Sequence, residues 1–134
     1  MKVLLDTNIL ISASMNNQGN PYLAFLKAVT APNKCVVCTQ NLNELERVYA
    51  RKFPHKISLL EKFLNFAFEE IDIIEMPIRT LKEEIKIRDI SDRPILRAAI
   101  IAKVEILVTG DKDFLDSTVI DPKIMTAVEF LRLA

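Results

Sequence analysis

The sequence contains little of what several functional classes require. Of its 134 residues, two are glycine, two are cysteine, one is histidine and none is tryptophan. So few thiols and imidazoles leave little for a disulfide framework or a four-ligand zinc site. The longest apolar runs fall far short of the roughly 20 residues that a membrane helix needs, and the amino terminus lacks a signal peptide's long apolar stretch. We therefore expect a cytoplasmic protein with no membrane partner.

The two cysteines, Cys35 and Cys38, have the C-x₂-C spacing of zinc and redox sites. The KCVVC segment that contains them is typical of a strand, in which residues three apart point to opposite faces. Two thiols on opposite faces cannot share one metal ion, so we interpret both as small buried apolar residues. The single histidine, His55, lies in a Pro-His turn, and we predict a surface loop position for it.

The charges of the chain are balanced, with 18 basic and 18 acidic residues and no formal net charge. A nucleic-acid-binding protein usually has a basic surplus, so the overall charge does not favour that class. If several acids are bound around a metal ion, however, the remaining surface is effectively basic. Length and a hydrophobic content of 50% predict one domain, residues 1–134, with a single core.

Short apolar strands alternate with helical patterns along the chain. Strands are predicted at residues 2–6, 34–38, 71–75, 106–108 and 118–121. Helices are predicted after Asn8, around 22–29, from an N-cap at Thr39 to Pro54, at 57–70 and 80–87, from Asp92, and from Asp121-Pro122 onward. This alternation predicts an α/β sandwich on a mainly parallel sheet. Ligand sites in such sheets form beyond the carboxyl ends of the strands.

Four acidic residues lie where an apolar segment ends or a helix begins: Asp6, Glu44, Asp92 and Asp111. Each also has a simpler interpretation, because Asp6 and Asp92 suit helix N-caps and Asp111 suits a turn. Helical periodicity does not choose between Glu44 and Glu46, since both flank the apolar stripe. If the fold brings the four together, their carboxylates need a cation to stay ionised. Oxygen ligands of this kind suit Mg²⁺ or Mn²⁺.

Four segments carry a resemblance to a known family: LLDTNIL, LNELERV, SDRPILRAA and LVTGDKDF. Their order and spacing resemble the PIN-domain family of ribonucleases over essentially all 134 residues. Within that family the chain looks most like the toxin components of toxin–antitoxin pairs. The resemblance implies a PIN-like three-layer α/β/α sandwich with a mainly parallel central sheet. It also implies an endoribonuclease that depends on Mg²⁺ or Mn²⁺ and hydrolyses RNA phosphodiester bonds.

The resemblance also implies roles for individual residues. The metal-binding and catalytic acids of the family fall on Asp6, Glu44, Asp92 and Asp111, and a further acid falls on Asp113. Thr109 matches a polar position beside the site, and Asn8 matches a residue that orients the first aspartate. It is the resemblance, and not the periodicity, that selects Glu44 over Glu46 and Asp92 over Asp89.

Contact with an RNA substrate requires cations near these acids. The candidates are Arg47, Arg51, Arg93, Arg97 and Lys112, and for any one of them a solvated helix face or an ion pair is an equally simple interpretation. The resemblance further implies a protein antitoxin as partner and a possible homodimer. The apolar faces of the two helices between residues 41 and 68 are the predicted self-association surface.

Two other functions compete with the ribonuclease interpretation. The first is a haloacid-dehalogenase-like phosphatase, whose first strand is followed by D-x-D. Asn8 occupies the place of the second acid here, which argues against that chemistry. The second is a non-catalytic module that keeps the PIN fold for binding a partner. All the matched acids are present, so the sequence does not indicate that a catalytic site has degenerated.

Overall fold

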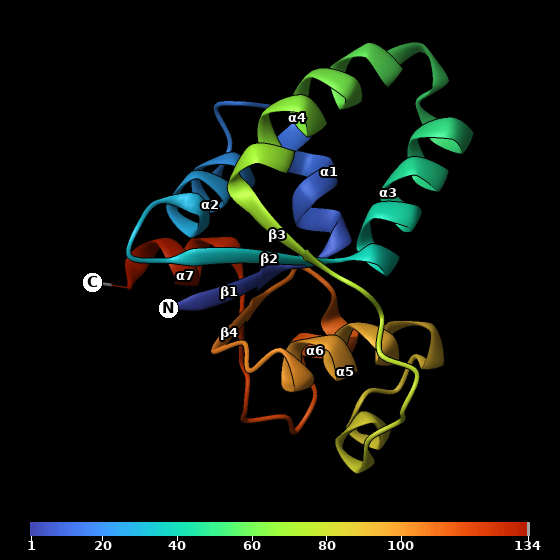
Figure 1. Ribbon diagram of the computed structural model, residues 1–134, viewed down its shortest axis with the longest axis vertical. Helices are drawn as coiled ribbons and strands as arrows, with labels where there is room; N and C mark the ends of the chain where they lie inside the picture. The colour runs from blue at the N-terminus through green and yellow to red at the C-terminus, as the bar shows by residue number, and fades with distance from the viewer. Residues whose placement is uncertain (134) are drawn as a thin grey trace.

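Five short strands form one parallel sheet at the centre of the molecule (Figure 1). The structure is a computed structural model that describes residues 1–133. The strand order is β3-β2-β1-β4-β5, and every neighbouring pair is parallel. The strands are β1 (Lys2–Leu5), β2 (Lys34–Cys38), β3 (Ile71–Ile74), β4 (Ile106–Val108) and β5 (Lys123–Met125). The first strand is therefore central, with β2 and β4 on either side.

Helices cover both faces of this sheet, which confirms the predicted three-layer sandwich (Figure 1). The α-helices are α1 (Thr7–Met15), α2 (Asn20–Val29), α3 (Thr39–Lys52), α4 (Ile57–Glu70), α5 (Arg93–Ile101), α6 (Lys112–Leu115) and α7 (Ala127–Arg132). Short 3₁₀ helices are η1 (Pro54–Lys56), η2 (Lys82–Lys86) and η3 (Ile90–Asp92). Helices α1 to α4 and α7 contribute to the core on one face, and α5 and α6 to the core on the other.

The two cores follow from the alternation of side chains along the strands. Val3 and Leu5 of β1 point into the larger core, where Phe25 of α2 stacks on Phe63 of α4 with ring centroids 5.0 Å apart. Leu4, between them in the sequence, points into the smaller core against α5. Both faces of β1 are thus buried, as expected of a central parallel strand.

The cysteines occupy opposite faces of β2, as the strand pattern predicted. Cys35 belongs to the larger core and Cys38 to the smaller one, and both are free thiols. Burial raises the pKa of the Cys35 thiol to about 12, so this group is an uncharged apolar residue in the fold. His55 is exposed in η1, where a surface position was predicted.

Four sequence predictions of local structure are wrong. Thr39 is the first residue of α3 rather than its cap, because Cys38 precedes the helix and its backbone N–H bonds to Asn41. Residues 118–121 form no strand; the strand is β5, in which Ile124 pairs with Leu107 of β4. The last helix therefore begins after Thr126, whose hydroxyl accepts a hydrogen bond from the Glu129 N–H. The predicted helix at 80–87 is the shorter 3₁₀ helix η2.

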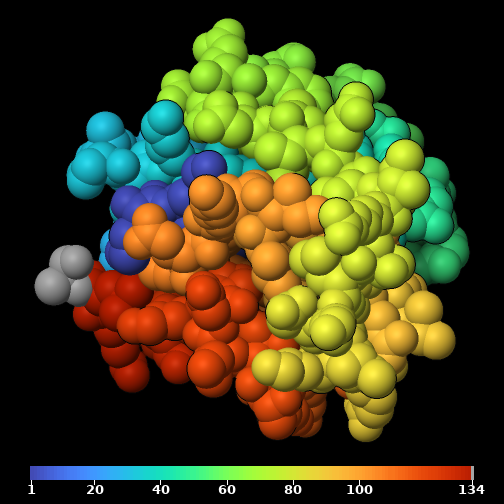
Figure 2. Space-filling model, turned by 60° about the horizontal axis from the view of Figure 1, so that its bottom comes forward, coloured from blue at the N-terminus to red at the C-terminus, as the bar shows by residue number. Residues whose placement is uncertain are grey.

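The long segment between β3 and α5 is held on the sandwich by a buried ion pair and by Ile87, which is buried in the smaller core. Figure 2 shows this segment in yellow on the surface, beside the orange part of the chain. The Arg97 guanidinium donates to both carboxylate oxygens of Glu84, at 2.8 and 3.0 Å, and to the Pro77 carbonyl at 2.8 Å. This bidentate contact lowers the pKa of Glu84 and raises that of Arg97. Arg97 on α5 thus holds two points of the segment.

Among residues 1–133, none of the helices combines the length and apolar character that crossing a lipid bilayer requires.

Candidate functional site

The site lies at the carboxyl ends of the two central strands β1 and β4. Leu5 of β1 is paired with Val108 of β4, and the Asp6 N–H continues the ladder by donating to the Val108 carbonyl at 3.0 Å. Asp6 and Thr109 therefore leave the sheet side by side. Asp6 is the N-cap of α1 and Asp111 is the N-cap of α6. Capping and ligand binding are thus compatible roles for the same residues.

The Asp6 carboxylate is buried and held by three donors. It accepts hydrogen bonds from the Thr7 N–H at 2.8 Å, the Thr109 hydroxyl at 2.8 Å and the Asn41 amide at 3.3 Å. Burial nevertheless raises the pKa of Asp6 to about 6, although the Thr109 and Thr7 hydrogen bonds oppose the shift. Repulsion from Glu44 and Asp111 adds to the rise. Burial, with a smaller contribution from the two neighbouring acids, therefore outweighs what the hydrogen-bond donors offset.

Glu44 faces this network from α3, whereas Glu46 is exposed to solvent. The Thr7 hydroxyl donates to Glu44 at 2.8 Å and accepts from the Asn41 amide at 3.0 Å. Gln40 donates to the second Glu44 oxygen at 3.3 Å. Of the two glutamates between which helical periodicity does not choose, only Glu44 is linked to Asp6 through shared hydrogen-bond partners.

Asp92 and Asp111 approach each other from different elements. Asp92 ends η3 at the start of α5, and Asp111 precedes α6, where it accepts from the Asp113 N–H at 2.9 Å. The pKa of Asp92 is raised to about 8, first by burial, then by its hydrogen bond and charge repulsion with Asp111, and less by repulsion from Asp6 and Asp89. Two carboxyl groups this close cannot both ionise easily without a cation.

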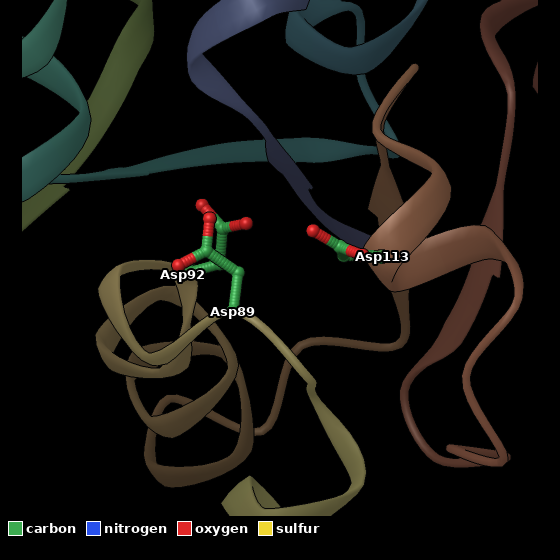
Figure 3. A group of neighbouring side chains, drawn as sticks. All are labelled: Asp89, Asp92 and Asp113. Atoms are coloured by element: carbon green, nitrogen blue, oxygen red, sulfur yellow. The ribbon is translucent and has the colours of Figure 1, made fainter.

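Asp89, Asp92 and Asp113 each offer a carboxylate oxygen within 4.8 Å of the others. Figure 3 shows Asp113 facing Asp89 and Asp92 across a gap. Asp89 was set aside in favour of Asp92 on sequence grounds, but the fold places the two together. Asp89 has its own local partner, because it accepts from the Ser91 N–H and hydroxyl at 3.0 and 2.8 Å. Asp113 is paired with Arg88.

The two predicted supporting residues have different positions. The Thr109 hydroxyl bridges the site by donating to Asp6 and accepting from the Asp111 N–H at 3.0 Å. Asn8 is exposed and accepts from the Gly110 N–H at 3.3 Å. Its expected role of orienting Asp6 is therefore wrong for this chain. Thr109, Asn41 and the Thr7 N–H do this instead.

Asn41 and Thr7 are the site residues that sequence reasoning missed. Asn41 is completely buried, and its amide joins Asp6, Thr7 and the Cys38 N–H. The signal was present in the sequence, because Asn41 lies one helical turn before Leu45 on the buried stripe of α3. A polar residue on such a stripe needs a buried partner.

The predicted substrate-binding cations divide into available and occupied groups. Arg47 and Arg51 line a groove of about 450 Å³ together with Gln40, Glu44, Val48, Ser91 and Asp92. Lys112 is exposed beside Asp113. Arg93 donates through Nε to the Ile87 carbonyl at 2.9 Å. Arg97 is buried in its pair with Glu84, so the prediction that it contacts a substrate is wrong.

The carboxylates of the site fit a divalent cation. The Oδ2 atom of Asp92 is shielded from solvent and has no hydrogen-bond partner in the described part of the chain. Asp6 and Asp92 both have raised pKa values because neighbouring carboxylates and burial disfavour their charge. A cation offsets both effects, and oxygen-rich sets of carboxylates are typical of Mg²⁺ and Mn²⁺ sites.

Comparisons with known proteins agree with this arrangement. A family model described as a PIN domain matches residues 2–113. Eight chains of solved structures match the fold. One is the crystal structure of VapBC2 from Rickettsia felis bound to a DNA fragment from their promoter. That chain is 22% identical, with a TM-score of 0.66, and the match covers 93% of this chain and 97% of that chain. No curated protein matches this sequence.

Proposed function

The chain belongs to the PIN domain family, and from that premise we propose that it is a metal-dependent endoribonuclease. In this proposal residues 1–134 form a single nuclease domain that hydrolyses RNA phosphodiester bonds with Mg²⁺ or Mn²⁺. Its products carry 5′-phosphate and 3′-hydroxyl ends. The protein acts as the toxin of a toxin–antitoxin pair in the cytoplasm.

One observation carries this proposal: carboxylates from distant parts of the chain converge at the carboxyl edge of β1 and β4. Asp6 interacts electrostatically with Glu44 and Asp111, and Asp92 with Asp111 and Asp6. The pKa values of Asp6 and Asp92 rise to about 6 and about 8 as a result of this crowding and of burial. Such raised values in a cleft are typical of functional sites.

The proposed ligands are Asp6, Asp92 and Asp111, with Glu44 and Asp113 completing the set. When bound, Mg²⁺ or Mn²⁺ supplies Lewis acidity for the attack of water on a phosphodiester. The half-buried carboxyl of Asp92 and the partly exposed Glu44 are the groups positioned to take the proton of the attacking water. Thr109 and Asn41 hold Asp6 in one orientation, which keeps the ligand oxygens in place.

Arg47 and Arg51 are the proposed contacts to substrate phosphates at this site. They lie one helical turn apart on α3 and line the groove that Asp92 and Glu44 also line. Cations beside the acids compensate for a chain with no net charge, because they concentrate positive potential where the polyanion must bind. Lys112 and the terminal nitrogens of Arg93 are further candidates.

A protein antitoxin is the proposed partner, and a homodimer the proposed assembly. The fold match to VapBC2, a toxin–antitoxin complex, supports this partner class. Exposed apolar side chains on α4, including Ile57, Leu59 and Phe66 at 40–46% exposure, lie within the predicted self-association surface. A monomer in light scattering at high protein concentration would remove the homodimer from the proposal.

The decisive experiment uses the Asp6→Asn variant on a mixed pool of single-stranded RNA with and without Mn²⁺. Wild-type protein should cleave only with Mn²⁺ and leave 5′-phosphates. The variant should lose at least about 100-fold in kcat/KM, because a ligand charge is removed. It should keep its fold and melt at a higher temperature than the wild type without metal, because a buried charge is relieved.

Asp72→Asn is the matched control, since it makes the same change at an exposed position of β3. Its cleavage rate should equal that of the wild type. Full activity in folded Asp6→Asn protein rejects the site. Metal binding without any cleavage by the wild type favours the non-catalytic partner-binding module instead.

A further inference from the structure

We propose that Lys86, Arg88 and Lys112 form a second phosphate-binding site, on the opposite side of the carboxylates from Arg47 and Arg51. A single RNA strand then passes over the carboxylates. Its phosphates are bound by one group of cations before the cleaved bond and by the other group after it. This inference rests on the proposed ribonuclease function and adds how the substrate lies in the site.

The first side of this path is the groove beside α3. Its cations, Arg47 and Arg51, are exposed and make no ion pair or side-chain hydrogen bond with the rest of residues 1–133. Asp92 lines the same groove. The groove therefore joins two unpaired guanidinium groups directly to a proposed metal ligand.

The second side is a smaller hollow of about 150 Å³. Its lining residues are Lys86, Arg88, Lys112, Asp113, Asp116 and Ser117. The cations come from three neighbouring parts of the chain, namely the end of η2, the loop after it and the start of α6. The Lys86 and Lys112 ammonium groups form no ion pair within the described residues, and the Arg88 side chain is 86% exposed.

The two hollows meet at the carboxylates. Asp92 lines the first and Asp113 lines the second. Their carboxylate oxygens, with one of Asp89, lie within 4.8 Å of one another, and Figure 3 shows Asp113 facing the other two. Each hollow thus holds cations beside a carboxylate of this cluster. Basic grooves of this kind track the backbone of a single strand.

Arg88 couples this path to the metal ion. In the structure its guanidinium is paired with Asp113, a proposed ligand, and with no other carboxylate among residues 1–133. A cation bound at Asp113 competes for that carboxylate and leaves Arg88 free for a phosphate. RNA and metal are therefore expected to bind more tightly together than separately.

The first test measures binding of a labelled single-stranded RNA of about 20 nucleotides by fluorescence anisotropy over a range of monovalent salt, at a constant Mn²⁺ concentration that releases Arg88 from Asp113. The full-length protein carries Asp6→Asn so that the RNA stays intact. Adding Lys86→Ala and Arg88→Ala should reduce the salt slope by about 1.4 and weaken binding at 0.1 M salt by about 25-fold, for two lost phosphate contacts.

Lys62→Ala with Lys123→Ala is the matched control, because it removes the same charge from exposed positions on α4 and β5. The control pair should leave the slope unchanged. Equal slopes for the two pairs overturn the second phosphate site. If the alanine pair lowers the melting temperature, Lys86→Gln with Arg88→Gln makes the same measurement. Equal binding of duplex RNA overturns the single-strand path.

The second test maps cleavage in RNA labelled at either end. Wild-type protein should leave the linkages nearest both ends intact. Cleavage requires a bound phosphate on each side of the cleaved bond, and a linkage near an end has no such phosphate on one side. The Lys86→Ala/Arg88→Ala pair, tested with Asp6 intact, should lose this restriction at one end only. Cleavage up to a terminus by the wild type overturns the inference while the ribonuclease function stands. Absence of both binding and cleavage overturns the ribonuclease proposal itself.

Discussion

At the scale of single residues, Asp6 shows how a carboxylate is kept poised for a cation. Its donors come from Thr7, Asn41 and Thr109, and two of these bonds measure 2.8 Å. Those bonds favour the charged form, yet its pKa rises to about 6 because burial and nearby acids outweigh them. If Asp6 binds the proposed divalent cation, a proton and that cation compete for the same oxygens near neutral pH.

This competition predicts the pH dependence of stability in metal-free protein. The folded-state pKa values of Asp6 and Asp92, about 6 and about 8, exceed the ordinary 3.8. The folded state thus binds more protons than the unfolded state between about pH 4 and 8. The free energy of unfolding should be highest at the low end of that range and fall as pH rises, by about 1–3 kcal/mol from Asp6.

Urea unfolding in EDTA at pH 5 and pH 8 measures this change. Asp6→Asn should remove the part of the decline between about pH 4 and 6, and saturating Mn²⁺ should flatten the profile. Stability that rises with pH over this range would contradict the assignment of raised pKa values.

The positions of some site residues could be predicted from the sequence better than those of others. Asp6 and Asp111 follow apolar strands directly, so parallel-strand geometry alone places them at one edge. Glu44 and Asp92 lie on helices, whose orientation depends on packing that local patterns do not contain. Arg97 was misjudged for the same reason, because its partner Glu84 lies 13 residues away on a different element. The presence of an arginine on a helix face does not show whether its partner is a carboxylate of the protein or a ligand.

At the scale of elements, a buried ion pair is one of the contacts that hold the segment between β3 and α5. It contains little regular structure beyond η2 and η3, but it delivers Arg88, Asp89 and Asp92 to the site. The pair of Arg97 and Glu84 is almost completely buried, with 11% and 7% of the side chains exposed. Buried pairs of this type are costly to break because one charge is left unpaired.

We therefore expect Glu84→Gln to lower the free energy of unfolding by about 3 kcal/mol. Because the segment carries Asp92, the variant should also bind Mn²⁺ more weakly. Denaturant unfolding and calorimetric metal titration measure the two effects. The neighbouring, exposed Glu83→Gln should change stability by less than about 0.5 kcal/mol. Equal stability of the two variants would show that the pair does not hold the segment.

Element boundaries at the carboxyl terminus were mispredicted for an identifiable reason. Ile124 and Met125 have the spacing of a helix face with Val128 and Leu131, but they pair with Leu107 and Val108 as β5. Sheet pairing overrides a weak local preference. The capping pair Thr126 and Glu129 marks the true start of α7, and this signal is visible in the sequence.

At the scale of the whole molecule, metal binding should be linked to global stability. The proposed ligands come from the junction of β1 and α1, from α3, from η3 and from the start of α6, so a bound ion connects elements from both faces of the sheet. A ligand present at 100 times its Kd stabilises the native state by about 2.7 kcal/mol. In a thermal-shift assay the melting temperature should rise with increasing Mn²⁺ by an amount that corresponds to this free energy. Asp92→Asn should make that rise smaller.

Exposed Asp121→Asn serves as the control for charge and should follow the wild type. A melting temperature that does not respond to Mn²⁺ or Mg²⁺ would leave the carboxylate cluster without its proposed ion.

The central place of β1 also has a consequence for biosynthesis. Asp6 is among the first residues to be translated, but the Thr109 hydroxyl that holds it comes 103 residues later. The ribosome must therefore synthesise and release β4 and Asp111 from its exit tunnel before the carboxylates can assemble. Under the proposed ribonuclease function, a nascent chain up to that point would lack the assembled site and would not cleave the RNA around it.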